Sequence, residues 1–244
     1  MSAVRVERLG RIELITLDRP QRRHAVDSAM ALELEAAWVG FARGDARVAV
    51  LCGSGEQAFC SGLDIDDPPL EPWICLPGLA VEMDKPVIAA VSGWAVGLGL
   101  ALTMAADLAV AARGARFVYP EGRLGMTGGL ISGLVSRLSH KRAMQVMLLG
   151  EPFTAAQACD MDLVNEVVDD GAHCERALEW AELIASHSPL VMRTLKRLAR
   201  DSLPDSAAES AARMQREIRA VARSADRAEG AAAARARRDP DFSD

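Results

Sequence analysis

The sequence predicts an α/β fold that carries a helical region at its C-terminal end. Short apolar, strand-like runs alternate with helical patterns over the first two-thirds of the 244 residues. Helical patterns alone fill the rest, from His173 onward. Half of the residues are hydrophobic, which is enough to build a substantial core.

Strand and helix signals follow one another through the first half of the chain. Residues 4–20 alternate between apolar and polar positions and turn at Gly10, which predicts a β-hairpin. Asp27 is a suitable N-cap for a helix from Ser28 to about Phe41. Apolar content and turn residues then predict strands over 47–53 and 87–91, a loop over 54–63, and an irregular Pro-rich segment over 66–84.

The second half moves from mixed signals to helices alone. The predicted elements are a helix over 98–106, strands over 107–112 and 115–120, helical patterns over 132–149, and a strand over 163–168. Gly150 supplies a helix end, and Thr154 with Gln157 forms a capping-box pattern for a short helix. From residue 173 the chain is predicted helical, with breaks near Pro189 and Pro204.

Composition argues against several classes of protein. The net charge of -6 disfavours general affinity for nucleic acid. The five cysteines form no CxxC pair, and Arg5, Glu7 and Arg8 stand where a secretory signal would need an apolar run. We therefore expect reduced thiols and a cytoplasmic location.

One uncharged stretch, residues 86–106, is long enough to span a bilayer. Four small or turn-forming residues interrupt its middle: Ser92, Gly93, Gly97 and Gly99. Asp107 closes it, and an ordinary strand pattern follows. A buried strand followed by a buried helix explains the same composition, so we expect no membrane span.

Two Gly-containing turns, in residues 59–65 and 93–101, each follow a predicted buried strand. A turn that runs into a helix leaves backbone N–H groups free. If the two turns converge, two N–H groups can hold one developing oxyanion, such as that of a thioester enolate. Close packing alone would also explain these glycines, and their spacing leaves both interpretations open.

Glu121 lies between Pro120 and Gly122, after a predicted strand, and could move protons at such a site. A solvated loop carboxylate is the plainer interpretation. Gly97 and Gly99 also begin a dinucleotide-binding pattern, but Leu102 stands where its third Gly belongs. The four histidines show no metal-ligand spacing, and no GxSxG is present, so zinc or serine-hydrolase chemistry has no support.

Taken together, the motifs resemble the crotonase superfamily, the enoyl-CoA hydratases and isomerases. Six blocks occur in family order along nearly the whole chain: ITLDRPQRRHAV (15–26), AFCSGLDI (58–65), KPVIAAVSGWAVGLGLAL (85–102), FVYPEGRLGMTGG (117–129), LLGEPFTAAQACDMDLVNEVV (148–168) and SADRAEGAAAARARRDPDF (224–242). Six ordered blocks are far more specific than any single motif.

The resemblance implies a spiral of ββα units over residues 1–187 and a C-terminal helical oligomerisation region over residues 188–244. It implies a homotrimer or hexamer and an acyl-CoA thioester substrate, with coenzyme A as part of the substrate and no separate cofactor or metal. The oxyanion-hole amides then fall on Leu63 and Leu98, where the family usually has Gly at the second position.

The resemblance also implies which acids act. Family hydratases carry two Glu, and the corresponding positions here are Ala101 and Glu121. Hydration usually shares the positioning of water and the delivery of a proton between two carboxylates. Double-bond migration needs one base, and family isomerases resemble this chain in having a single Glu. We therefore predict an isomerase-like reaction with Glu121 as acid/base.

Further positions are implied to contact substrate: Gly62, Asp64, Gly97, Gly99, Ala101, Thr127, Gly128, Arg237 and Arg238. The tail arginines match a basic pair whose family role includes touching CoA phosphates of a neighbour. A solvated or subunit-facing helix is the plainer explanation of the Arg-rich tail, and we favour it. Hydration with water held by Ser132 or Thr127, another thioester reaction such as hydrolysis, and a non-catalytic acyl-CoA binding subunit are the alternatives.

Overall fold

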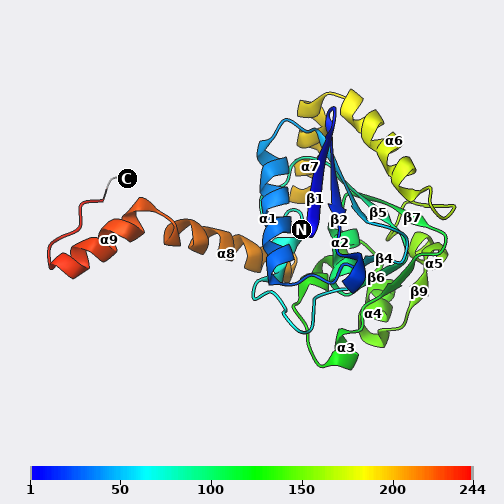
Figure 1. The fold of residues 1–244 in the computed structure, drawn as a ribbon, viewed down its shortest axis with the longest axis horizontal. Coiled ribbons are helices and arrows are strands. Elements are labelled where there is room, and N and C mark those ends of the chain that lie inside the picture. The colour runs from blue at the N-terminus through cyan, green and yellow to red at the C-terminus, as the bar shows by residue number, and fades with distance from the viewer. Residues whose placement is uncertain (1, 243–244) are drawn as a thin grey trace.

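The computed structural model describes residues 2–242 and contains two β-sheets surrounded by helices (Figure 1). The larger sheet has the order β1-β2-β3-β5-β7-β10. Its strands are β1 (Val4–Leu9), β2 (Ile12–Leu17), β3 (Val48–Gly53), β5 (Val87–Val91), β7 (Leu108–Ala112) and β10 (Glu166–Val168). Only the β1–β2 hairpin is antiparallel among these pairs.

The smaller sheet has the order β4-β6-β8-β9. Its strands are β4 (Ala58–Cys60), β6 (Trp94–Val96), β8 (Arg116–Val118) and β9 (Phe153–Thr154), and the first three are parallel. Three consecutive strand pairs repeat along the chain: β3–β4, β5–β6 and β7–β8. In each pair the first strand belongs to the larger sheet and the second to the smaller sheet, and an α-helix follows each of the last two pairs. This repetition is a spiral of ββα units, as predicted.

The helices vary in length and in how closely they join the body. The α-helices are α1 (Ser28–Arg43), α2 (Leu98–Ala105), α3 (Glu121–Leu124), α4 (His140–Leu149), α5 (Ala155–Asp160), α6 (His173–Ser186), α7 (Pro189–Asp201), α8 (Ala207–Ala222) and α9 (Ala225–Ala236). Short 3-10 turns occupy Pro20–Arg22, Pro72–Cys75 and Leu130–Ser136. Figure 1 shows α8 and α9 projecting away from the body, whereas α7 lies against it.

Two apolar clusters lie on either side of the larger sheet. One contains most of the core, including the fully buried Trp38, Phe41 and Phe59. The other is smaller, and in it α6 packs small residues such as Ala177 and Ala181 against the sheet. Small side chains let the helix backbone approach the sheet closely, so the sheet is covered on this face.

Local signals predicted several elements correctly. The hairpin turns at Gly10, and Asp27 accepts a hydrogen bond from the Met30 N–H at the start of α1. Thr154 and Gln157 form the predicted capping box, and Ser188 followed by Pro189 begins α7. These outcomes agree with the strong preference of such residues for helix starts.

Four predictions of local structure need correction. Residues 132–149, predicted helical throughout, are not a continuous helix: a 3-10 segment ends at Ser136 and α4 begins at His140. Gly133 lies within the 3-10 segment, and the Ser136 hydroxyl donates to the Gly133 carbonyl oxygen, which competes with α-helical bonding. Strand β6 was predicted as part of a turn, and β4 as part of a loop; pairing between the two stabilises both. The helical tail also breaks at Arg223 and Ser224.

Candidate active site

The three strands β4, β6 and β8 bring the predicted site residues to one edge of the smaller sheet. The strands are parallel neighbours, so their carboxyl ends meet at the same edge. Leu63 follows β4, Leu98 follows β6, and Glu121 follows β8. The sheet topology thus brings together residues that are up to 58 positions apart in the sequence.

Close backbone contacts confirm that the three segments converge. A Cβ atom on Gly62 would lie 3.3 Å from the Val96 carbonyl oxygen. A Cβ atom on Gly97 would lie 3.0 Å from the Glu121 Oε1 atom. Gly62 immediately precedes Leu63, and Gly97 immediately precedes Leu98. The Glu121 carboxyl therefore lies beside the turn that presents the Leu98 amide.

The Leu63 amide points away from its strand partner. Val26 forms an isolated parallel bridge with Leu63: the Val26 N–H donates to the Gly62 oxygen, and the Asp64 N–H donates to the Val26 oxygen. In a parallel bridge the residue between these two bonds directs its own N–H to the other side. That N–H is free to meet a ligand.

The Leu98 amide is free because Leu98 is the first residue of α2. The first N–H groups of a helix have no intrahelical acceptor, and here the Ala101 N–H donates to the Gly97 oxygen. The positive φ of the turn, +51°, falls on Gly97 and not on Leu98. A leucine is therefore accommodated without backbone strain at the position where the family usually has Gly.

Glu121 begins α3 and is placed in an environment that favours its neutral form. Burial raises the pKa of its carboxyl to about 7. Its Oε2 atom is buried and has no hydrogen-bond partner among the described residues. A carboxyl with a near-neutral pKa can both accept and return a proton, and a free oxygen gives the proton a place to go.

Tyr119 lies near this carboxyl and contacts Thr127, and sequence reasoning assigned no role to the tyrosine. The Tyr119 hydroxyl lies 3.4 Å from the Thr127 Oγ1 atom. The backbone amide of Glu121 and, to a smaller extent, the nearby Tyr119 hydroxyl oppose part of the rise in the pKa of Glu121 that burial causes. The available signal was its position, two residues before Glu121 at the end of a strand.

Asp64, predicted to contact substrate, is held in ion pairs with two arginines, and its contact with substrate stays a prediction. Its buried carboxylate lies 2.7 Å from Arg19 Nη1 and 3.0 Å from Arg22 Nη2. These guanidinium groups hold the pKa of Asp64 well below its usual range. The ion pairs tie the loop after β4 to the segment after β2, so Asp64 supports the position of Leu63.

The remaining predicted residues divide into two groups. Gly99 and Ala101 are buried within α2, where a Cβ atom on Gly99 would lie 2.3 Å from the Cys60 carbonyl oxygen. Gly128 is exposed beside Thr127 in the segment after α3. Helix α2 is thus held against β4 at the point where the two amides originate.

Arg237 and Arg238 do not join the Glu121 group within one chain. They follow the end of α9, and this helix projects far from α3 (Figure 1). Arg238 forms an ion pair with Glu229 at 2.5 Å. Any contact of these arginines with substrate would therefore require a second copy of the chain.

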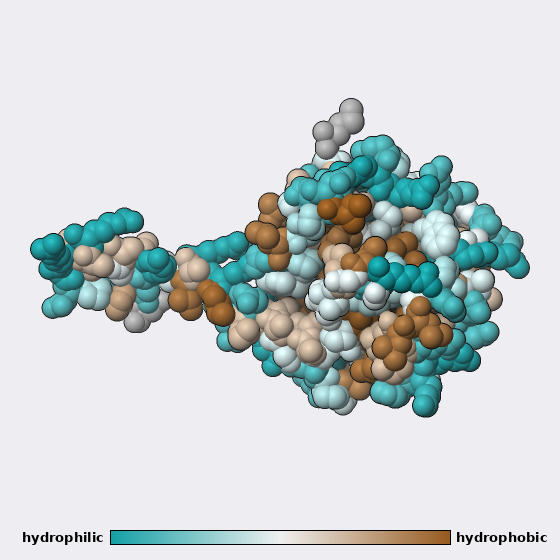
Figure 2. Space-filling model, turned by 90° about the horizontal axis from the view of Figure 1, so that it is seen from below, coloured by the Kyte–Doolittle hydropathy of each residue, from teal (hydrophilic) through white to brown (hydrophobic). Residues whose placement is uncertain are grey.

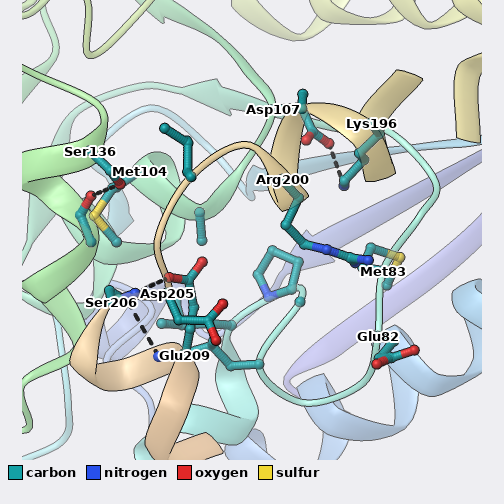
Figure 3. A pocket seen from close by; sticks show the side chains of 18 of the residues that line it. Glu82, Met83, Met104, Asp107, Ser136, Lys196, Arg200, Asp205, Ser206 and Glu209 are labelled. Carbon is teal, nitrogen blue, oxygen red and sulfur yellow. Dashed lines mark hydrogen bonds and ion pairs between the residues drawn. The ribbon is translucent and has the colours of Figure 1, made fainter. Parts of the chain in front are cut away.

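A separate cavity of about 940 Å³ lies near the other end of α2, between α7, α8 and the segment after Leu76 (Figure 3). Polar side chains enter it from several elements, and Lys196 pairs with Asp107 at 2.6 Å. Met104 at the end of α2 contributes to its wall. Neither Glu121 nor the two amide-bearing leucines line this cavity, so the candidate site is distinct from it.

Comparisons with known proteins identify the family. The enoyl-CoA hydratase/isomerase family model matches residues 74–244. A 2,3-dehydroadipyl-CoA hydratase from Escherichia coli (strain K12) is 34% identical, with 99% of each chain covered. A 1,2-epoxyphenylacetyl-CoA isomerase from the same strain is 32% identical, with 93% of each covered. The crystal structure of carnitinyl-CoA hydratase from Mycobacterium avium aligns with a TM-score of 0.78 at 34% identity, covering 99% of this chain and 98% of that chain.

The fold is therefore the mixed α/β fold of the crotonase superfamily. The chain belongs to the enoyl-CoA hydratase/isomerase family and is an acyl-CoA enzyme of that family. In residues 2–242 no helix is both long and apolar enough to cross a membrane. The division at residue 187 and the cytoplasmic location stay predictions.

Proposed function

We propose that the protein catalyses double-bond migration in an acyl-CoA thioester, with Glu121 as the single acid/base. Glu121 removes a proton from C2 of a 3-enoyl thioester and returns it to C4. The double bond then moves to C2–C3, and no atom is gained or lost. One carboxyl can perform both transfers because it is regenerated in its basic form at the end.

The enolate formed after the first transfer needs its charge stabilised. The free N–H groups of Leu63 and Leu98 originate at the same sheet edge, beside Glu121. We place the thioester oxygen between them, because oxyanion donors act where negative charge develops. Coenzyme A enters as part of the substrate, and the proposed chemistry requires no separate cofactor.

The observation that supports this proposal most is the contrast between Glu121 and Ala101. Glu121 has a carboxyl with a pKa near 7 and an unpartnered oxygen. Ala101, at the position of the other Glu of family hydratases, is buried on α2 and can neither hold nor deprotonate water. A single base suits proton transfer between two carbons better than addition of water.

Hydration is the second candidate, because several similar proteins are named as hydratases. Of the two hydroxyls proposed to hold water, Ser132 accepts a hydrogen bond from the Ala208 N–H in α8. That contact directs Ser132 toward the projecting helices. Thr127 remains the better candidate, since its Oγ1 atom lies 3.4 Å from the hydroxyl of Tyr119, two residues before Glu121.

We further propose that α7 and α8 mediate assembly into a homotrimer or hexamer. Both helices expose large apolar side chains: Leu190, Leu195, Leu198, Met214, Ile218 and Val221. Figure 2 shows apolar side chains where the projecting helices leave the body. Exposed apolar patches of this kind mark interaction surfaces. Light scattering should give a mass of at least three chains.

The test of function is mass spectrometry of products formed from 3-enoyl-CoA and 2-enoyl-CoA in deuterated water. Deuterium incorporation with a shifted double bond and no added water supports the proposal. Gain of water indicates a hydratase, and absence of exchange on both substrates contradicts proton transfer by Glu121. Glu121→Gln should lower turnover by about 100-fold or more, whereas full turnover would contradict its role.

A further inference from the structure

His24 is a buried polar side chain, with only 1% exposure, in the turn between β2 and α1. Its backbone φ of +57° lies in the left-handed region, which His and Asn adopt more readily than most residues. Arg23 before it also has a positive φ, +51°. Two such residues in succession cost backbone energy, so the turn persists only where surrounding contacts hold it.

The contacts of the imidazole ring determine the role of each ring nitrogen. Nδ1 lies 3.0 Å from the backbone nitrogen of Arg19, whose N–H can only donate. Nε2 lies 3.0 Å from the carbonyl oxygen of Ser54, which can only accept. The ring is therefore neutral and carries its proton on Nε2, and burial lowers the pKa of His24, which favours this form. The imidazole thus closes the turn from residue 19 to residue 24 and joins it to the end of β3.

The turn held by the imidazole supports the loop after β4. Three backbone hydrogen bonds, at 3.0, 2.9 and 2.8 Å, join residues 23–26 to residues 61–64. The Arg19 guanidinium adds an ion pair with Asp64 at 2.7 Å. Leu63 lies within this pairing, and its own N–H points away from it. The direction of that N–H therefore depends on where the turn is held.

We propose that His24 is a positioning residue for the oxyanion hole: its two ring nitrogens hold the turn of residues 19–24, and through it the loop of residues 61–64, so that the Leu63 N–H is aimed at the thioester oxygen. This inference rests on the proposed role of Leu63 as an oxyanion donor. A purely structural histidine would affect stability alone, whereas a positioning histidine also affects the strength of one donor. A displacement near 1 Å in such a group can lower activity by about 100-fold.

Substitutions at His24 separate the hydrogen bonds of the ring from its bulk. His24→Gly removes the ring and adopts a positive φ freely. It should lower kcat on 3-enoyl-CoA by about 10- to 100-fold and change KM little, because an oxyanion donor acts mainly in the transition state. His24→Asn keeps an acceptor atom bonded to Cγ, as Nδ1 is, and tolerates a positive φ. It should therefore stay within about fivefold of the wild type.

A further variant and a matched control complete this test. His24→Gln moves the acceptor one bond farther from Cγ, so it should lose activity as His24→Gly does, and it replaces that variant if the glycine protein does not fold. His173→Ala is the control. His173 is also buried, with 4% exposure, but neither of its ring nitrogens has a hydrogen-bond partner among residues 2–242. This variant should keep the kcat of the wild type even where its Tm falls.

The second test does not require turnover. Butyryl-CoA labelled with ¹³C at its thioester carbonyl reports hydrogen bonding to that oxygen through the carbonyl stretching frequency, measured by infrared difference spectroscopy. Binding to the wild type and to His24→Asn should lower the frequency, and binding to His24→Gly should lower it less. A folded His24→Gly with wild-type kcat and frequency, or a His24→Asn as slow as His24→Gly, overturns the inference. An unshifted frequency in the wild type overturns the proposed oxyanion hole, and with it the proposed function, instead.

Discussion

Substituting Gly99 by Ala perturbs the junction between the two proposed oxyanion donors. Gly99 follows Leu98 in α2, and Cys60 ends β4 shortly before Leu63. The added Cβ would lie 2.3 Å from the Cys60 carbonyl oxygen, and 3.0 Å from the Cys60 Cβ. Both neighbours belong to packed core elements, so neither can rotate away as a flexible side chain would.

The size of the expected effect follows from this distance. The α2 and β4 backbones must separate by about 0.7 Å or more to reach a tolerable contact. A displacement near 1 Å in a positioned reacting group can lower activity by about 100-fold, so we expect kcat/KM to fall by about 10- to 100-fold. Overpacking of this kind costs about 1–3 kcal/mol of stability, which lowers Tm by about 2–12 °C for a chain of this size.

The assay combines kcat/KM on the thioester that is turned over with thermal unfolding. Gly40→Ala is the matched control, because Gly40 is exposed within α1 and a Cβ there meets no atom within 4 Å. Ala favours the helix by about 1 kcal/mol, so that variant should keep full activity and gain a few degrees in Tm. If Gly99→Ala retained wild-type kcat/KM and Tm, the argument that close α2–β4 contact positions the donors would be wrong.

Three further predictions concern the donors, the base and the supporting ion pairs. Leu98→Pro removes one N–H at the first position of α2, where Pro is tolerated. It should lower kcat by about 100-fold or more, while the circular dichroism spectrum stays unchanged. A variant as active as the wild type would show that Leu98 is not part of the oxyanion hole. Because Glu121 must be ionised to accept a proton and its pKa is about 7, kcat/KM should fall about tenfold per pH unit below pH 7, and a flat profile from pH 5 to 8 would disagree with this assignment. Asp64 has a lowered folded pKa, so its stabilising effect is present above its unfolded value of 3.8 and is lost as pH falls below it. Asp64→Asn should therefore lower Tm at neutral pH, with a difference from wild type that narrows in acid; a constant difference would argue against the ion pairs with Arg19 and Arg22.

Local sequence patterns were sufficient where one short segment decides its own structure. Asp27 caps α1, and the Thr154–Gln157 box begins α5, because each motif satisfies amides within its own first turn. The alternation of strand and helix signals predicted the α/β core. The order of the six blocks predicted the family, and the resemblance to that family implied the ββα spiral. Glu121 was identified from its place after a strand and a proline.

Tertiary structure decided what depends on distant partners. Strand β6 exists because β4 and β8 pair with it on both sides, and three residues carry too little periodicity to predict a strand. The ion pairs of Asp64 depend on the fold because Arg19, distant in sequence, reaches its carboxylate. The contact between Tyr119 and Thr127 likewise depends on the fold of residues 119–129, since the directions of side chains are set by packing and not by the order of residues.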